Sequence, residues 1–181
     1  MIRALYIGRF QPYHNGHHYV IHQIAQEADE LIIGIGSAQM SHEPTDPFTA
    51  GERVLMITHA LQGLHKPLYV IPLEDINRNA LWVSHVRAMT PPFHRIYSGN
   101  PLVIRLFHEA GIEVHRPLMY ERATLSGTKI RDLIAREERW EEYVPPPVVR
   151  VIQEIDGITR IRALNQDDGD DTGFEETTDH V

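Results

Sequence analysis

Residues 8–17 read Gly8-Arg9-Phe10-Gln11-Pro12-Tyr13-His14-Asn15-Gly16-His17, and the rest of the chain is organised around this stretch. The run before it, Ile2–Ile7, is mostly apolar and predicts a buried strand that ends at a glycine. The residues after it place apolar side chains at helical spacing, at Val20, Ile21, Ile24 and Ala28. We therefore expect a helix that begins near Asn15 or Gly16. Asn15 is the expected N-cap, because its side-chain oxygen can accept a hydrogen bond from a free amide of the first turn.

A strand, loop and helix joined in this way form a natural phosphate-binding site. The first amides of the helix are unpaired, and the helix dipole places its positive end there. The loop adds His14, His17 and Arg9, and Gly16 would let a phosphate approach the backbone without meeting a Cβ. The same letters can also arise as an ordinary helix start. A second motif, described below, favours the functional interpretation.

The composition indicates one globular domain. The chain has 181 residues, 42% of them hydrophobic and 23% charged. It has no cysteine, which excludes disulfides, thiolate metal sites and a thiol nucleophile. We find no apolar run long enough to span a membrane and no signal peptide, so we expect a cytoplasmic protein with no membrane partner.

The charge is unevenly distributed. The formal net charge is −8, but residues 165–181 hold seven of the 25 acidic residues and none of the 17 basic ones. The body of the chain is therefore almost neutral and shows no basic footprint for nucleic acid. We expect a folded domain over residues 1–164 and a disordered acidic tail over residues 165–181.

Strand-like and helix-like segments alternate along the body of the chain. Further strands are expected at residues 30–37, 68–72, 95–99 and 112–115. Helical patterns begin near residues 50 and 79, run from about 101 to 110, and follow Pro147 as one more helix that closes near Gly157. This order predicts an α/β fold with a parallel sheet and helices on both faces. Open sheets of this kind bind ligands beyond the carboxyl ends of their strands, where Gly99 and Asn100 lie.

The second motif is Ser126-Gly127-Thr128-Lys129-Ile130-Arg131, which opens another predicted helix. Ser126 and Thr128 offer hydroxyls at the helix start, and Arg131 lies one turn further on. The motif is either an N-cap followed by a solvated arginine or a second phosphate cradle. As a cradle it would hold the β and γ phosphates of a nucleotide, while the first motif serves the α phosphate.

Together the two motifs resemble the H-x-G-H nucleotidyltransferase superfamily. The chain is identified more closely as similar to the archaeal nicotinamide-nucleotide adenylyltransferase family, over about residues 2–164. Stretches that carry this closer resemblance are residues 35–39, 47–53, 79–83, 90–93 and 97–103. The resemblance implies a Rossmann-like sheet and the reaction of nicotinamide mononucleotide (NMN) with ATP to give NAD and pyrophosphate. It also implies Mg²⁺, bound mainly through the ATP phosphates with no metal ligands of the protein, and a homo-oligomer, commonly a hexamer. Lys129 and Asp132 depart from the family pattern beside Arg131.

The resemblance also implies roles for individual residues. His14 and His17 would donate hydrogen bonds to the phosphates, with His17 at the α phosphate, and Arg9 and Arg131 would hold the triphosphate. Further ATP contacts are expected from Gly8, Phe10, Gly99, Asn100, Ser126 and Thr128. NMN contacts are expected from Ser37, Asp75, Asn79 and Trp82.

Some residues have simpler explanations. Trp82 either faces the nicotinamide ring or is a core aromatic of an amphipathic helix. Arg53 is either a weak site candidate or a surface ion pair with Glu52. His14, His17 and His18 could instead form a metal site, although no carboxylate or cysteine lies near them in the sequence.

Other functions share parts of this pattern. A sister enzyme acting on FMN, phosphopantetheine or an alcohol phosphate would carry the same phosphate motifs, and only residues 75–82 argue against it. A class I aminoacyl-tRNA synthetase uses a similar motif in a longer chain. A nucleotide sensor without catalysis would tolerate the loss of His14 or His17.

Overall fold

The structure of the protein is a computed structural model that describes residues 1–117 and 125–166. Its centre is a five-stranded sheet with the strand order β3-β2-β1-β4-β5. Every neighbouring pair in the sheet is parallel. The strands are β1 (Arg3–Gly8), β2 (Glu30–Ile35), β3 (Leu68–Pro72), β4 (Arg95–Tyr97) and β5 (Glu113–His115). Each strand expected from the sequence forms within two residues of its expected ends, so the predicted parallel α/β sheet is confirmed.

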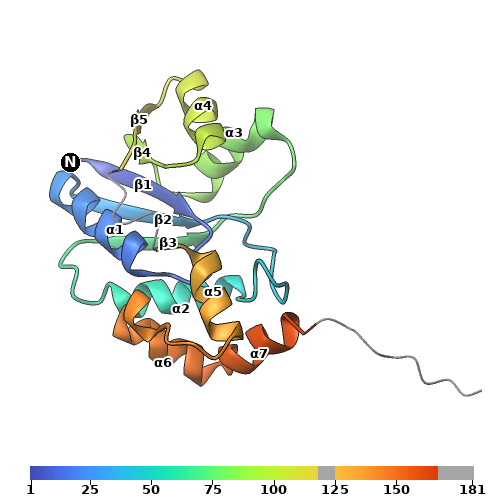
Figure 1. The fold of residues 1–181 in the computed structure, drawn as a ribbon. Coiled ribbons are helices and arrows are strands. Elements are labelled where there is room, and N and C mark those ends of the chain that lie inside the picture. Colours follow the sequence, from blue (N-terminus) through green and yellow to red (C-terminus); the bar gives the residue numbers. More distant parts are fainter. Residues whose placement is uncertain (118–124, 167–181) are drawn as a thin grey trace, which may run out of the picture.

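Helices cover both faces of this sheet (Figure 1). They are α1 (Asn15–Glu27), α2 (Ala50–Ala60), α3 (Asn79–Met89), α4 (Pro101–Glu109), α5 (Gly127–Ala135), α6 (Pro146–Glu154) and α7 (Gly157–Leu164), with a short 3-10 helix η1 (Glu141–Tyr143). Helices α3 and α4 pack on one face, and the other helices gather on the opposite face. In the described residues no helix is both long and apolar enough to cross a bilayer.

The alternation of side chains along the strands explains the two layers. In β1, Ala4 and Tyr6 join the core that contains α1, α2 and α5, whereas Leu5 joins the core formed with α3 and α4. Successive side chains of a strand point to opposite faces, so a strand buried on both faces shows a continuous apolar run. Val86 and Phe107 fill the smaller core from α3 and α4.

The strand order reverses between β1 and β4. From β1 the chain winds outward through β2 to β3, then returns to place β4 and β5 on the other side of β1. A reversal of this kind separates the loops that follow the two central strands and leaves a crevice beyond their carboxyl ends. The first motif follows β1 and the loop with Gly99 follows β4, so both open onto that crevice.

The C-terminal part differs from the expectation of a single helix. The helix expected after Pro147 begins at Pro146 and ends at Glu154, and a second helix, α7, follows from Gly157. Asp156 separates them with a left-handed φ of 54°, which interrupts the helical path. Most of the expected acidic tail, residues 167–181, lies outside the described residues. Gln166 still donates its amide to the carbonyl of Arg162.

Candidate active site

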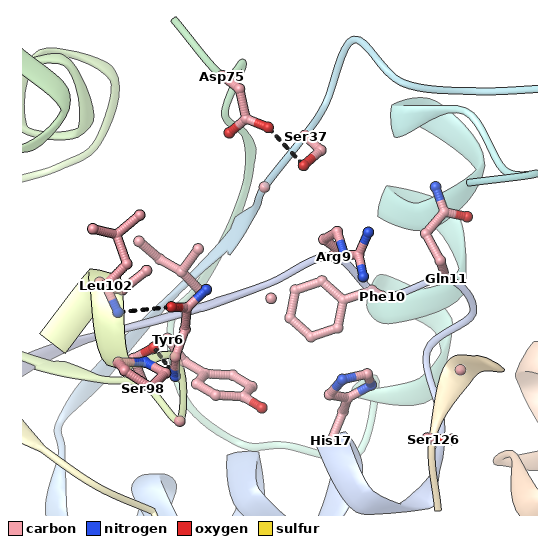
Figure 2. A pocket seen from close by; sticks show the side chains of 18 of the residues that line it. Tyr6, Arg9, Phe10, Gln11, His17, Ser37, Asp75, Ser98, Leu102 and Ser126 are labelled. Carbon is pink, nitrogen blue, oxygen red and sulfur yellow. Dashed lines mark hydrogen bonds between the residues drawn. The ribbon is translucent and has the colours of Figure 1, made fainter. Parts of the chain in front are cut away.

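A cavity of about 780 Å³ opens where the strand order reverses. Its wall comes from the loops after β1, β2, β3 and β4 and from the start of α5 (Figure 2). Every site residue expected from the sequence lines this cavity. They are Gly8, Arg9, Phe10, His14, His17, Ser37, Asp75, Asn79, Trp82, Gly99, Asn100, Ser126, Thr128 and Arg131. The fold therefore brings together two motifs that lie more than a hundred residues apart in the chain.

The cap of helix α1 is His14, not the expected Asn15. Nδ1 of His14 accepts a hydrogen bond from the amide of Gly16 at 3.1 Å, and Nδ1 of His17 accepts one from the amide of His14 at 3.4 Å. The two imidazoles thus form a reciprocal capping box. Asn15 instead donates its side-chain amide to the carbonyl of Glu142. The expectation for Asn15 was wrong because imidazole Nδ1 can also act as a cap acceptor.

This cap determines which nitrogen of each neutral ring carries the proton. A ring nitrogen that accepts a hydrogen bond carries no proton, so the proton of each neutral imidazole lies on Nε2. Burial lowers the pKa of His14 to about 4. Burial and the neighbouring His14 also lower the pKa of His17 well below its usual value. Near neutral pH both side chains are therefore neutral donors with Nε2–H available.

Aromatic packing holds the two rings. The imidazoles of His14 and His17 stack with centroids 3.7 Å apart, and the ring of Phe10 meets His17 edge-on at 4.7 Å. Phe10 is almost completely buried, so its ring supports His17 from inside the wall. A Cβ on Gly16 would lie 3.0 Å from two atoms of the His14 ring. Gly16 therefore makes room for that imidazole, a reason that the sequence did not reveal.

One buried carboxylate faces the arginines of the site. Oδ2 of Asp46 lies 3.6 Å from Nη1 of Arg9 and accepts a hydrogen bond from the hydroxyl of Thr45 at 2.8 Å. The carboxylate also favours the charged form of Arg131, whereas burial and Arg9 lower the pKa of that guanidinium. The positive charges around the first motif thus have an internal counter-ion. Sequence reasoning missed Asp46, which lies in the long polar loop before α2.

The start of α5 is pressed against the first motif. Arg131 donates to the carbonyls of Gln11 at 2.7 Å and Pro44 at 3.0 Å. A Cβ on Gly127 would lie only 2.5 Å from the carbonyl oxygen of Gln11, so this approach requires glycine. Ser126 caps α5 by accepting from the amide of Lys129 at 3.2 Å, which confirms the N-cap interpretation of that serine. Arg131 is buried rather than solvated.

The loops after β2 and β3 meet at another part of the cavity. The hydroxyl of Ser37 donates to Oδ2 of Asp75 at 2.7 Å (Figure 2). The amide of Asp75 donates to the side-chain oxygen of Gln39 at 3.0 Å, a contact that sequence reasoning missed. Trp82 is half-buried on α3, and its ring packs at 90° to Phe107 with centroids 5.7 Å apart. It contributes both to the smaller core and to the cavity wall.

The remaining polar residues sit at helix starts. Asn79 is the first residue of α3 and is exposed. Asn100 caps α4, and its Oδ1 accepts from the amide of Leu102 at 2.9 Å. That hydrogen bond leaves the side-chain NH₂ of Asn100 able to donate into the cavity.

Arg53 is not a surface ion pair. Its side chain is fully buried, and Glu52 pairs instead with Arg160 through contacts of 2.7 and 2.9 Å. The alternative of a surface pair was wrong because the helix face that carries Arg53 packs beneath the loops after β1 and β2.

The alternative metal site does not form. Nδ1 of His18 lies 3.2 Å from the hydroxyl of Tyr13, and its Nε2 lies 3.1 Å from Nε2 of His22. Within residues 1–117 and 125–166, no three histidine or acidic side chains are grouped so that they could hold a metal ion.

Comparison with known proteins identifies the class. Residues 5–133 match the family model described as cytidylyltransferase-like. The fold and the cavity thus define a nucleotidyltransferase of this family.

Curated relatives narrow the family further. The chain is 90% identical over 173 residues to the nicotinamide-nucleotide adenylyltransferase of Methanospirillum hungatei, with 96% of this chain and 99% of the relative covered. It is 66% identical over 164 residues to the enzyme of the same name from Methanosphaerula palustris, with 91% and 98% covered. The chain belongs to the nicotinamide-nucleotide adenylyltransferase family. The family resemblance stated from the sequence is confirmed. The alternative functions, which were an adenylyltransferase for another phosphate acceptor, an aminoacyl-tRNA synthetase and a nucleotide sensor, are disfavoured.

A solved structure supports the fold. The crystal structure of a bifunctional NMN adenylyltransferase/ADP-ribose pyrophosphatase from Francisella tularensis, in complex with AMP and a manganese ion, matches with a TM-score of 0.74 at 22% identity. The match covers 90% of this chain but only 52% of that one, so this chain spans about half the length of that protein.

Proposed function

We propose that this chain transfers the adenylyl group of ATP to the phosphate of NMN, which gives NAD and pyrophosphate. One observation carries the proposal beyond family membership. One cavity contains side chains that can bind phosphate, which are those of His14, His17 and Arg131. The same cavity contains the hydrogen-bonded pair of Ser37 and Asp75 and the aromatic ring of Trp82. Such a cavity fits a substrate with a phosphate at one end and an aromatic amide at the other.

The reaction needs positioning and charge stabilisation more than proton transfer. An oxygen of the NMN phosphate bonds to the α-phosphorus of ATP. The bond from that phosphorus to the β-bridging oxygen breaks, and the oxygen keeps the electron pair as pyrophosphate leaves. The attacking phosphate is already an anion, so no general base is required. The barrier is then lowered mainly by alignment and by donors directed at the developing charge.

The two imidazoles would supply neutral donors for this step. Because Nδ1 of each ring is engaged by a backbone amide, Nε2–H is the only polar ring atom left for a phosphate. We assign His17 to the α phosphate and His14 beside it. Arg9 is exposed enough to move from Asp46 to a triphosphate, and Arg131 retains unused N–H groups beside Thr128.

Asp75, Asn79 and Trp82 would recognise the nicotinamide. The carboxamide NH₂ can donate to Asp75, whose Oδ1 is not used by Ser37. Asn79 can serve both amide functions, and the face of Trp82 can contact the cationic ring.

Magnesium fits this site as a cation carried by the substrate. In the described part of the chain no cluster of three histidine or acidic side chains could bind it alone, so the triphosphate oxygens would be its main ligands. When bound, Mg²⁺ would supply positive charge between those oxygens.

A homo-oligomer, a hexamer as the resemblance implies, is part of the proposal. Leu81 and Met89 are large exposed apolar residues on α3, where Val86 is the only fully buried side chain. Light scattering after size-exclusion chromatography tests this state.

The function is tested by incubating the protein with ATP, Mg²⁺ and a panel of phosphate acceptors, with products identified by mass. NAD and pyrophosphate are expected from NMN. Faster reaction with FMN or phosphopantetheine would identify a sister enzyme instead. ATP binding without any product would favour the nucleotide sensor.

A further inference from the structure

Arg53 combines complete burial with an unusual set of partners. It lies in the first turns of α2 and is the largest fully buried side chain of the described residues. Among these residues no carboxylate lies within ion-pair distance of its guanidinium. Instead, the group donates to main-chain carbonyls of Thr49 (3.2 Å), Arg9 (2.9 Å), Gly36 (3.0 Å), Ser37 (3.1 Å), Ala38 (3.3 Å) and Met40 (3.3 Å). Burying a charge costs free energy unless the charge is hydrogen-bonded, so these carbonyls are what makes the buried position of the guanidinium stable.

The carbonyls belong to two different loops of the site. Arg9 lies in the loop after β1, which carries the phosphate-binding motif. Gly36, Ser37, Ala38 and Met40 follow β2, and Ser37 holds the carboxylate of Asp75. One Nη1 atom bonds to both loops, through the carbonyls of Arg9 and Gly36. A planar fork with five donors can do this, whereas a lysine ammonium cannot span the same acceptors.

Both loops contain a strained residue next to these carbonyls. Ser37 has a φ of 49° and Phe10, directly after Arg9, has a φ of 54°. This left-handed region is disfavoured for residues with a Cβ, so the surroundings must hold the chain there. Arg53 donates to the carbonyl of Arg9, which directly precedes Phe10. It also donates to the carbonyls of Gly36 and Ser37, which flank the φ angle of Ser37. The strained turns that aim Phe10 and Ser37 are thus fixed by one side chain.

We propose that Arg53 is a positioning residue that couples the two halves of the active site, holding the phosphate loop and the nicotinamide loop in register. It does not line the cavity, so it acts through Arg9 and Ser37 rather than on a substrate. The inference rests on the proposed function, because it needs both substrates to bind in this cavity.

The test is Arg53→Lys, which keeps the charge and most of the buried volume but loses the fork. Other hydrogen bonds between the two loops remain in this variant. Gly36 donates its amide to the carbonyl of Gly8 at 2.9 Å, and the side chain of Gln11 forms two hydrogen bonds with the backbone of Phe48. The folded variant should show kcat/KM reduced about 100-fold for ATP and for NMN alike, as expected for groups displaced by about 1 Å. It should also discriminate less between NMN and its deamidated form, because Asp75 is placed through Ser37.

Arg160→Lys is the matched control. Arg160, on α7, also binds with a fork of N–H groups, but its acceptors are the carboxylate of Glu52 and the carbonyl of Pro47 near the end of the loop after β2, not the carbonyls of Arg9 or of Gly36, Ser37, Ala38 and Met40. It should lower the melting temperature without changing the KM of either substrate. If Arg53→Lys behaves like this control, Arg53 is only structural and the inference is overturned.

A second variant guards against loss of folding in the first. Arg53→Ala leaves a cavity of guanidinium shape, and added guanidinium at millimolar concentration should restore turnover in a saturable manner. It should not restore His17→Ala. Absence of rescue in a folded Arg53→Ala protein would contradict the inference. If wild type makes no NAD, the proposed function fails instead.

Discussion

The amide of His14 donates a hydrogen bond to Nδ1 of His17 at 3.4 Å, so one imidazole both caps helix α1 and faces the cavity. The helix start and the donor set are therefore one structure. Any change at His17 alters the end of a helix as well as the chemistry of the site, and experiments must separate the two effects.

Replacing His17 by alanine should lower kcat by about 10²–10³, the usual cost of removing one donor from developing charge. ATP binding should weaken only modestly. Glutamine at the same position can place an NH₂ near Nε2 and should retain more of the rate. Steady-state kinetics with ATP and NMN measure this.

The control for this change is His22→Ala, on the same helix but exposed and outside the cavity. It should leave kcat unchanged. Turnover in His17→Ala equal to wild type would remove His17 from the mechanism.

Stability should fall in weak acid because of His14. Its pKa is about 4 in the folded protein and near 6.5 in the unfolded chain. Between these pH values the unfolded chain binds a proton at His14 that the folded chain does not bind. The contribution of His14 to the free energy of unfolding is therefore constant above about pH 6.5 and declines as the pH falls towards 4. The decline from this residue is at most roughly 3 kcal/mol.

Urea denaturation at a series of pH values between 7.5 and 4 measures that decline. His14→Asn keeps a cap acceptor and removes the titrating ring, so its curve should be flatter than that of wild type. Part of the slope should remain, because the pKa values of His17 and His18 are also lowered by burial. An unchanged slope would mean that His14 does not titrate as the geometry requires.

Replacing Trp82 by alanine should raise the KM for NMN about 5- to 30-fold, from loss of a cation–π contact of ~1–2 kcal/mol. The KM for ATP should change little, since the triphosphate is held by other residues. Arg87→Ala, on the same helix, exposed and outside the cavity, is the control. Because Trp82 also packs on Phe107, the melting temperature must be measured. Equal weakening of both substrates would make Trp82 a core residue only.

Replacing Asp75 by asparagine should narrow the preference for NMN over its deamidated form. In wild type the carboxylate of the deamidated substrate would face the carboxylate of Asp75, and like charges repel. Asparagine removes that repulsion and can donate to the new carboxylate. The ratio of kcat/KM for the two substrates is the measurement, and a ratio unaffected by the change would place the carboxamide elsewhere.

Much of this molecule could be predicted because the signals are local. Apolar runs that end in glycine or polar loops located the strands, and the rule for strand ends located the cavity. The N-cap was misassigned because Asn15 and His14 are both able to cap, and only the observed ring orientation distinguishes them. The end of the helix after Pro147 was expected near Gly157 and is found at Glu154, whereas the further helix α7 was not expected.

The sequence by itself determined the parallel α/β fold, the loops that carry the chemistry and, through the motifs, the family. Periodicity, capping types and turn residues depend on neighbours a few positions away, and the chain displays them directly. The tertiary structure alone decided the burial of Arg53, the counter-ion role of Asp46 and the need for Gly127. Each depends on atoms from distant segments, such as the carbonyl of Gln11 against Gly127, that meet only when the helices pack on the sheet.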